Sequence, residues 1–353
     1  FLAAGLVTEA VAGTTWDDFI SVRIFQPLGM TRSNTSTLDL ADEGNVATPH
    51  QPFDEEVKPI PYRNIDNVAP AGSINSSVWE MTHWMRMMLG EGEFEGERIL
   101  SEAVVREVHT PNIIYPAGAQ TRRLFPSMHF STYGLGWGLR DYHGHLLATH
   151  TGGIDGMLSQ IMLVPEQELG VIVLTNTTNA GAFDAITYRI IDSYLGAPTT
   201  DWNATFLEMT TQQRQAAEAQ QQEQEESRVE GTSPSLPLSA YAGDYENEMY
   251  GTLTIAEENG ELVARRHSTF VGDLEHWHFD TFVATWRDLS MSAGPGTPIT
   301  FTLGSDGKVA SASLDMQGIA EFERVPVPSR GEGWGFCASA SPLTRSDKGV
   351  SGG

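Results

Sequence analysis

Apolar residues recur every three or four positions at the start of the chain, which is the period of an amphipathic helix. This spacing predicts a helix over residues 2–12, closed by Gly13 where a left-handed C-terminal cap is expected. A second helix follows directly. It begins at a Thr14 or Thr15 cap and ends at Pro27, because proline cannot continue a helix.

The helical period returns after residues 31–75, a stretch rich in Asp, Asn, Ser and Pro that we interpret mostly as loop. Ser77 and Glu80 match a capping box, and a stripe of Met and Trp follows on one face as far as Gly90. Such a stripe is more often core packing than a cofactor site. A short helix over residues 101–109 is predicted next.

The period changes from helical to alternating in the middle of the chain. Four short apolar segments are joined there by turns rich in Gly, Asp or Glu: STYGLGWGLR, HLLATH, LSQIMLVPE and LGVIVLTN. Short strands with short turns predict an antiparallel meander. Residues 180–195, with Phe183, Ile186 and Ile191 at helical spacing, should pack back on that sheet. Helices before and after a meander predict an α+β layer domain.

Composition sets the expected domain boundaries. Residues 1–198 form the α+β domain, and residues 199–235 are rich in Gln and Glu, which predicts a solvated helix that leads into a linker. Over residues 236–326, short alternating segments separated by Asn-Gly and Asp-Gly turns predict a small all-β, barrel-like domain. Residues 327–353 show no packing pattern, and we expect a disordered tail there.

Charge and cysteine content exclude several classes of function. The 353 residues carry 21 Lys and Arg against 46 Asp and Glu, a formal net charge of −25. Such a polyanion repels phosphate backbones, so nucleic acid is not an expected partner. Cys337 is the one cysteine, which excludes an intrachain disulfide and a thiolate metal cluster. No apolar run approaches the roughly 20 residues of a transmembrane helix.

The stretch ATHTGGIDGM, residues 148–157, is the strongest candidate for chemistry. Two apolar strands flank its glycine-rich centre, which places His150 beside backbone that has no side-chain cover. On its own this pattern is that of an ordinary hairpin with a histidine at its edge. The other interpretation is an imidazole that takes part in acid–base chemistry.

Four segments in order resemble the penicillin-recognising serine hydrolases, which include class C β-lactamases, DD-peptidases, D-aminopeptidases and esterases. They are VTEAVAGTTWDDFISVRIFQPLGM, PAGSINSSVWEMTHWMRMML, YGLGWGL and HTGG. The later LSAYAGDYENEMYGTLTI is similar to the β-barrel accessory domain that often follows such hydrolases. The order of four segments is far more specific than any one of them. The resemblance implies a β-lactamase/transpeptidase-like α+β domain followed by a small all-β barrel.

The same resemblance assigns roles around the HTGG element. His150 takes the place of the first residue of the family's K-T-G, where it would orient a tyrosine proton or polarise the leaving group. Thr151 would face the substrate, and the N–H of Gly153 would donate to an oxyanion. The missing side chains of Gly152 and Gly153 would let an acyl group approach.

The family's other two elements, S-x-x-K and Y-x-N, are not found where the pattern expects them. Literal matches occur at Ser305 with Lys308, at Tyr62 with Asn64, and at Tyr245 with Asn247. We interpret the first as a hairpin turn and the other four residues as turn or surface groups. The chain is therefore expected to begin just after the Y-x-N, and to lack the nucleophile, its lysine and the tyrosine.

The remaining candidates are few. Asn75 in AGSINSS and Tyr133 in YGLGW are expected to border the cleft and to contact substrate. His276 and His278 alternate on one strand face, but two histidines without a third ligand do not predict a metal site. We therefore expect neither a metal ion nor a cofactor.

Together these expectations describe the C-terminal portion of a serine hydrolase of the β-lactamase-like superfamily. It would hydrolyse an amide or ester in a small-molecule or peptide substrate through an acyl-enzyme, although the chain by itself is expected to be inactive. The alternative is a non-catalytic binding module derived from such a hydrolase, and an S-x-x-K and a Y-x-N before Phe1 would favour the enzyme. By resemblance we expect a periplasmic or secreted location. The choice among lactam, peptide and ester, and the oligomeric state, stay open.

Overall fold

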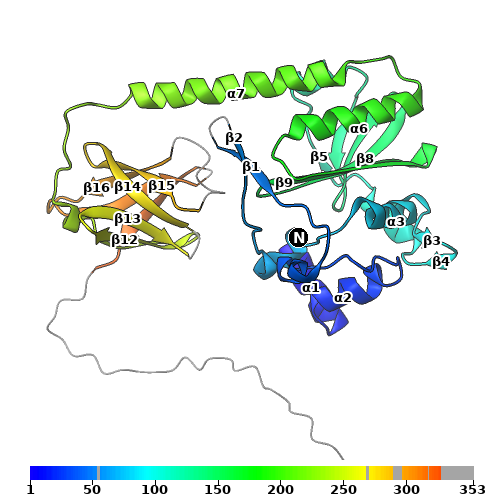
Figure 1. Cartoon of the computed structure of the whole chain (residues 1–353), viewed down its shortest axis with the longest axis horizontal. Helices are drawn as coiled ribbons and strands as arrows, with labels where there is room; N and C mark the ends of the chain where they lie inside the picture. The colour runs from blue at the N-terminus through cyan, green and yellow to red at the C-terminus, as the bar shows by residue number, and fades with distance from the viewer. Residues whose placement is uncertain (54–55, 268–269, 289–295, 317, 327–353) are drawn as a thin grey trace, which may run out of the picture. The chain divides into compact units, whose positions relative to one another are not determined.

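The structure, a computed structural model, describes residues 1–53, 56–267, 270–288, 296–316 and 318–326 (Figure 1). The chain divides into two units. The first holds Phe1–Gly231 with Thr285–Gly296, and the second holds the rest. The predicted tail, residues 327–353, lies outside the described residues.

Seven α-helices are found among the described residues of the first unit. Their bounds are α1 Leu2–Ala12, α2 Trp16–Ile20, α3 Val78–Leu89, α4 Glu102–Val108, α5 Ala119–Leu124, α6 Ala180–Leu195 and α7 Trp202–Glu226. The predicted helix ends are confirmed at two places. Gly13 caps α1 with a left-handed φ of 70°, and Thr15 caps α2 by accepting a hydrogen bond from the N–H of Asp18.

A six-stranded antiparallel sheet forms the centre of the first unit, and its strands lie in sequence order, which confirms the meander. The strands are β5 Ile113–Ile114, β6 Ser131–Tyr133, β7 Gly138–Tyr142, β8 His145–Ile154, β9 Met157–Val164 and β10 Leu169–Thr175. The sequence did not predict β5, because a strand of two residues is too short to show alternation.

Two small hairpins lie outside this sheet. They are β1 His50–Phe53 with β2 Glu56–Pro59, and β3 Glu93–Phe94 with β4 Glu97–Arg98. The first hairpin falls in the stretch that was predicted to be mostly loop. All four residues of β2 are exposed, so no apolar alternation marks the strand.

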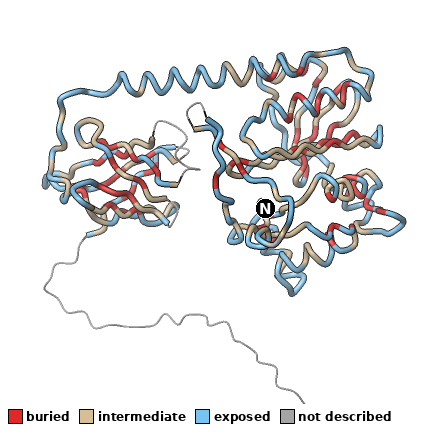
Figure 2. The backbone as a smooth tube through the Cα atoms, in the orientation of Figure 1, coloured by how far each residue is buried: buried red, intermediate tan, exposed pale blue. Residues whose placement is uncertain are grey.

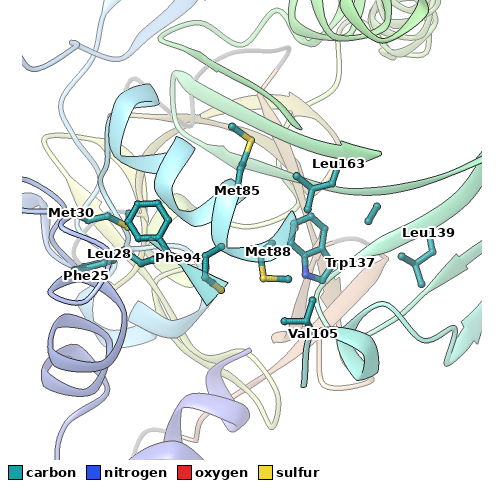
Figure 3. Packing of buried hydrophobic residues seen from close by; sticks show 12 residues of the cluster. Phe25, Leu28, Met30, Met85, Met88, Phe94, Val105, Trp137, Leu139 and Leu163 are labelled. Carbon is teal, nitrogen blue, oxygen red and sulfur yellow. The ribbon is translucent and has the colours of Figure 1, made fainter. Parts of the chain in front are cut away.

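Helices α3 and α6 cover opposite faces of the sheet (Figure 1). Alternation along β8 sends Ala148 into the core beside α3 and Leu147 into the core beside α6. Figure 2 shows the buried residues concentrated along these strands and on the helix sides that face them. The predicted Met and Trp stripe is confirmed as core, since Met85 and Met88 pack in one cluster with Trp137 (Figure 3).

The capping box at the start of α3 is only half formed. The hydroxyl of Ser77 accepts a hydrogen bond from the N–H of Glu80 at 3.2 Å, as predicted. The Glu80 carboxylate does not return to Ser77. It accepts instead from the N–H of Arg32 at 2.8 Å and from the hydroxyl of Ser33 at 2.7 Å. A buried carboxylate therefore fixes the segment after α2 to the first turn of α3.

The core beside α6 contains a buried carboxylate with two donors. Asp192 accepts from the hydroxyl of Tyr142 at 2.5 Å and from the indole N–H of Trp202 at 2.6 Å. Burial and the adjacent Asp192 raise the pKa of Tyr142, so the phenol stays protonated and donates. This network joins β7, α6 and the first turn of α7.

Burial along α6 follows the predicted helical pattern except at one residue. Phe183 and Ile191 are buried as predicted, but Ile186 is exposed, because it lies on the side of α6 away from the buried Tyr188. In α7, Trp202 and Phe206 are buried in the same core. The later turns of α7 are mostly exposed along their length (Figure 2).

The second unit is a closed antiparallel barrel of eight strands, which confirms the predicted all-β domain. The strands are β11 Gly243–Asn247, β12 Gly251–Glu258, β13 Glu261–Arg266, β14 Phe270–His278, β15 Thr281–Trp286, β16 Thr297–Leu303, β17 Val309–Asp315 and β18 Ile319–Arg324. β11 pairs with β18 and closes the barrel, which leaves no open sheet edge.

Two of the literal motif matches lie in this barrel. Ser305 and Lys308 occupy the β16–β17 turn, where the N–H of Gly304 donates to the carbonyl of Lys308 at 2.8 Å, as predicted. The interpretation of Tyr245 as a turn or surface group is wrong. Its side chain is fully buried in the barrel core, and its hydroxyl donates to the carbonyl of Tyr241 at 2.6 Å.

None of the helices in the described ranges is both long enough and apolar enough to cross a bilayer.

The exposed part of α7 and the residues after it predict where a protease cuts first. Exposed backbone with few apolar contacts is the preferred site of nicking. Limited trypsin digestion should cut at Arg214 or Arg228 and release a β-rich fragment that begins between there and Leu236. Mass spectrometry of the first products tests this expectation. A first cut inside residues 131–175 would contradict it.

Candidate active site

Strand β8 is paired with β7 along its first half only. β7 pairs with His145–Thr149, whereas β9 pairs with Ala148–Ile154. Among the described strands, none pairs with the other edge of residues 150–154. The segment that contains HTGG therefore has a free edge, although β8 is an inner strand of the sheet.

The backbone of this free edge directs two N–H groups outward. β8 and β9 meet at a two-residue turn, Asp155–Gly156, so Ile154 belongs to the hydrogen-bonded pair that closes the hairpin. The N–H of Ile154 therefore faces β9. Because the N–H direction alternates along a strand, the N–H groups of Gly153 and Thr151 face the free edge. An oxyanion requires fixed N–H donors of this kind.

His150 lies at the start of the free edge among aromatic rings. Its ring centroid is 5.9 Å from that of Phe1, at an interplanar angle of 88°, and 6.4 Å from that of Tyr133. Tyr115 stands behind Tyr133 at 6.0 Å. No residue in the described part of the chain forms a hydrogen bond with the His150 imidazole. Both ring nitrogens are therefore available for proton transfer.

Tyr133 is a neutral donor beside that imidazole. Burial and the neighbouring Tyr115 phenol raise the pKa of Tyr133 above its ordinary value. The phenol is therefore protonated at neutral pH. The structure thus brings together two of the predicted residues, Tyr133 and His150, from strands that are not adjacent in the sheet.

The three residues after His150 differ in what surrounds them. Thr151 is exposed. An added Cβ at Gly152 would lie 2.4 Å from the hydroxyl of Ser159 on β9, so the missing side chain makes room for that neighbour. At Gly153 an added Cβ would lie 3.3 Å from Leu158. Of the two glycines, only Gly153 has its N–H directed to the free edge.

Asn75 is not joined to this group by any described hydrogen bond. Its side-chain amide donates to Asn34 at 2.9 Å and to the carbonyl of Ser73 at 3.1 Å. Its backbone pairs with Asn34 in an isolated bridge. The side-chain amide of Asn75 therefore donates to other parts of the chain, and a contact between Asn75 and substrate stays a prediction.

The tip of the β8–β9 hairpin is held by residues that sequence reasoning missed. The N–H of His50 on β1 donates to the carbonyl of Gly156 at 3.2 Å, and Arg63 forms an ion pair with Asp155. Asn176, after β10, donates to the carbonyl of Thr48 at 2.9 Å. No apolar pattern marks the segment that supplies these contacts, so the sequence carried no signal for them.

The described side chains contain no arrangement that could hold a metal ion. Within the described ranges, no group of three His, Cys, Asp or Glu side chains is placed to hold an ion. In the barrel, Nε2 of His276 lies 3.0 Å from the carbonyl oxygen of Phe279.

Comparison with known proteins identifies the family to which this chain belongs. Residues 1–195 match the family model described as Beta-lactamase, and residues 227–325 match a domain of unknown function, DUF3471. The first match covers more than half of the chain. The chain therefore belongs to the Beta-lactamase family, and it is a member of the β-lactamase-like hydrolase superfamily.

Two curated relatives are similar to large parts of the chain. Unguisins hydrolase ungD' of Aspergillus campestris is 27% identical over 325 residues, which cover 87% of this chain and 58% of that protein. Penicillin-binding protein 4 of Amycolatopsis lactamdurans is 28% identical over 192 residues, which cover 52% of this chain and 48% of that protein. The chain thus spans about half the length of these relatives.

Among solved structures, an octameric penicillin-binding protein homologue from Pyrococcus abyssi aligns with a TM-score of 0.47 at 19% identity. The alignment covers 90% of this chain and 62% of that chain.

Gly156 and Gly144 form a matched pair that tests how the hairpin tip is held. Both have left-handed φ angles, of 72° and 83°, so alanine strains either one by roughly 1 kcal/mol. An added Cβ at Gly144 meets nothing within 4 Å, but at Gly156 it would lie 2.7 Å from the backbone nitrogen of His50. Gly156→Ala should therefore destabilise the protein by about 1–3 kcal/mol more than Gly144→Ala in urea unfolding.

Equal free energies of unfolding for the two alanine variants would show that the contact between β1 and the hairpin tip contributes nothing.

Proposed function

We propose that this chain is the C-terminal portion of a serine hydrolase that cleaves an amide or ester through an acyl-enzyme. The free edge of β8 carries this proposal, because it combines outward N–H donors with an imidazole that has no hydrogen-bond partner in the described part of the chain. An oxyanion needs fixed donors at the place where charge develops, and the N–H of Gly153 supplies one. His150 and neutral Tyr133 supply groups that move a proton.

The reaction proceeds in two balanced steps. A serine Oγ attacks the carbonyl carbon, its proton passes to the leaving amine or alcohol, and the bond to that group breaks. Water then attacks the acyl-enzyme and releases the acid with the serine restored. In this proposal His150 and Tyr133 relay the proton to the leaving group, and Thr151 faces the substrate.

The serine and its lysine are proposed to come from outside residues 1–353. The sequence contains one S-x-x-K string, and its Ser305 and Lys308 lie in a turn of the barrel. An unactivated serine in such a turn is a poor nucleophile. The relatives are nearly twice as long as the region they share with this chain, which leaves room for both groups elsewhere in the protein.

A binding module derived from a hydrolase is the second candidate. The absence of an S-x-x-K string from residues 1–195 favours it. In that case the free edge would bind a carbonyl group without cleaving it. For either function we propose a periplasmic or secreted location, a small-molecule or peptide ligand and no nucleic-acid partner.

Covalent labelling separates these candidates. The 353-residue chain and the protein expressed from the complete gene are each incubated with a fluorophosphonate and a fluorescent penicillin, and intact masses are measured. We expect the chain to stay unlabelled, because donors without a nucleophile form no adduct. The product of the complete gene should carry one adduct on one serine.

A stoichiometric adduct on the 353-residue chain, above all at Ser305, would overturn the assignment of the nucleophile to other sequence. Absence of any adduct on the complete protein would favour the binding module.

His150→Ala in the complete protein tests the proton relay. Turnover of p-nitrophenyl acetate should fall about ten- to ten-thousandfold, the range for one acid–base or oxyanion contributor. His145→Ala is the matched control, because it removes an imidazole from the other end of the same strand, where β8 pairs with β7. Its turnover should stay within about twofold of wild type, as for a residue outside the acid–base chemistry. Equal turnover in both variants would leave His150 as an ordinary edge histidine.

A further inference from the structure

Three consecutive large apolar side chains are exposed at the edge of the sheet that holds the candidate site. Ile113, Ile114 and Tyr115 are exposed by 53%, 78% and 50%. The first two form β5, the edge strand, and the N–H of Tyr115 continues the ladder by donating to the carbonyl of Ser131 at 2.8 Å. A run of this kind is unfavourable in water unless it binds something.

Part of this run shares a face with Tyr133 and Thr151 of the candidate site, whereas alternation along β8 directs His150 to the opposite face. Residues directly opposite one another on paired strands point to the same face, and the register aligns Ile113 with Tyr133, Tyr133 with Gly138, and Gly138 with Thr149. The next residue of β8 on this face is Thr151. A continuous row therefore leads from the exposed edge strand to the free edge of β8.

This row contains a glycine and no charged side chain. Gly138 places no side chain between Tyr133 and Thr149, and an added Cβ there would be in ordinary contact with Thr149, 3.4 Å from its carbonyl oxygen. Tyr115, on the same face as Ile113 by alternation, packs edge-on against Tyr133 with 74° between the rings. No Asp, Glu, Lys or Arg is among these side chains, and the chain as a whole carries a net charge of −25. A carboxylate would find no cationic partner among these side chains, and the net negative charge of the chain disfavours an anion. Arg140, on the same face of β7, donates to the hydroxyl of Tyr188.

We propose that Ile113 and Tyr115 bind the apolar side chain of an uncharged substrate whose scissile amide or ester lies at the free edge of β8. This inference rests on the function proposed above and adds the class of substrate: neutral amides or esters with a large apolar or aromatic group. Tyr115 is a specificity-determining residue here and takes no part in the chemistry. The exposed part of this residue supplies the contact surface.

Binding to the 353-residue chain tests this without any need for turnover. Three probes are titrated by NMR: N-acetylphenylalaninamide, the N-acetylphenylalanine anion and N-acetylalaninamide. The first should bind roughly tenfold more tightly than either of the others, since only it combines a neutral end with a large apolar group. Tyr115→Ser should weaken that binding about five- to tenfold, and Tyr115→Phe should restore it, because the ring and not the hydroxyl makes the contact.

Tyr194→Ser is the matched control. Tyr194 is an exposed tyrosine of the same unit, at the end of α6, and its loss should leave all three affinities unchanged. Far-ultraviolet circular dichroism on each variant confirms that the fold is kept. Unchanged affinity in Tyr115→Ser, or equal affinity for the amide and the anion, would overturn the proposal.

Sedimentation and ester kinetics distinguish a substrate-binding surface from a contact between copies of the chain. If sedimentation shows a wild-type dimer that Tyr115→Ser dissociates, the run is such a contact and the proposal is wrong. In the complete protein, Tyr115→Ser should lower kcat/KM for p-nitrophenyl hexanoate about five- to tenfold and leave that for p-nitrophenyl acetate unchanged. Predicted binding without any hydrolysis would contradict the serine hydrolase and leave the apolar surface supported.

Discussion

The difference in length between β7 and β8 is the constraint on which the candidate site depends. β7 has five residues and β8 has ten, so pairing on one side of β8 stops at Thr149. Unpaired N–H groups are costly when they are buried, but at an open edge they are donors for a ligand. A β7 longer by four residues would pair with the same N–H groups and abolish the site, with almost no change in the fold.

The open edge also has to be held in place, and this depends on contacts from distant parts of the first unit. β9 supports one side of residues 150–154 along the whole length. The hairpin tip is fixed by the backbone of His50 and by the ion pair between Arg63 and Asp155. A half-buried ion pair and one backbone hydrogen bond contribute little to stability alone. Their effect is positional, since they limit how far the free half of β8 can bend.

The sequence predicted the elements whose signal is periodic, and missed contacts that depend on single residues. Helix α3 and the meander extend over enough residues to show a period, so their type and order followed from apolar spacing. β5 has two residues and no period. Glu80 matched a capping box, but its carboxylate found stronger tertiary donors at Arg32 and Ser33, which no local rule includes. Tyr245 was interpreted from a three-residue motif, although its alternation within β11 places it in the barrel core.

Some residues of the candidate site were predicted from the resemblance to a family, and others were found only from the packing in the structure. His150 and Gly153 were placed by the HTGG element, since strand position fixes which N–H faces the edge. Tyr115 had no such marker, because its proximity to Tyr133 arises from the pairing of β5 with β6. A hydrolase and a binding module would share all of these contacts. They differ in whether a nucleophile turns a bound carbonyl into an oxyanion. In a hydrolase the outward N–H groups would stabilise that charge more strongly than the neutral carbonyl from which it forms.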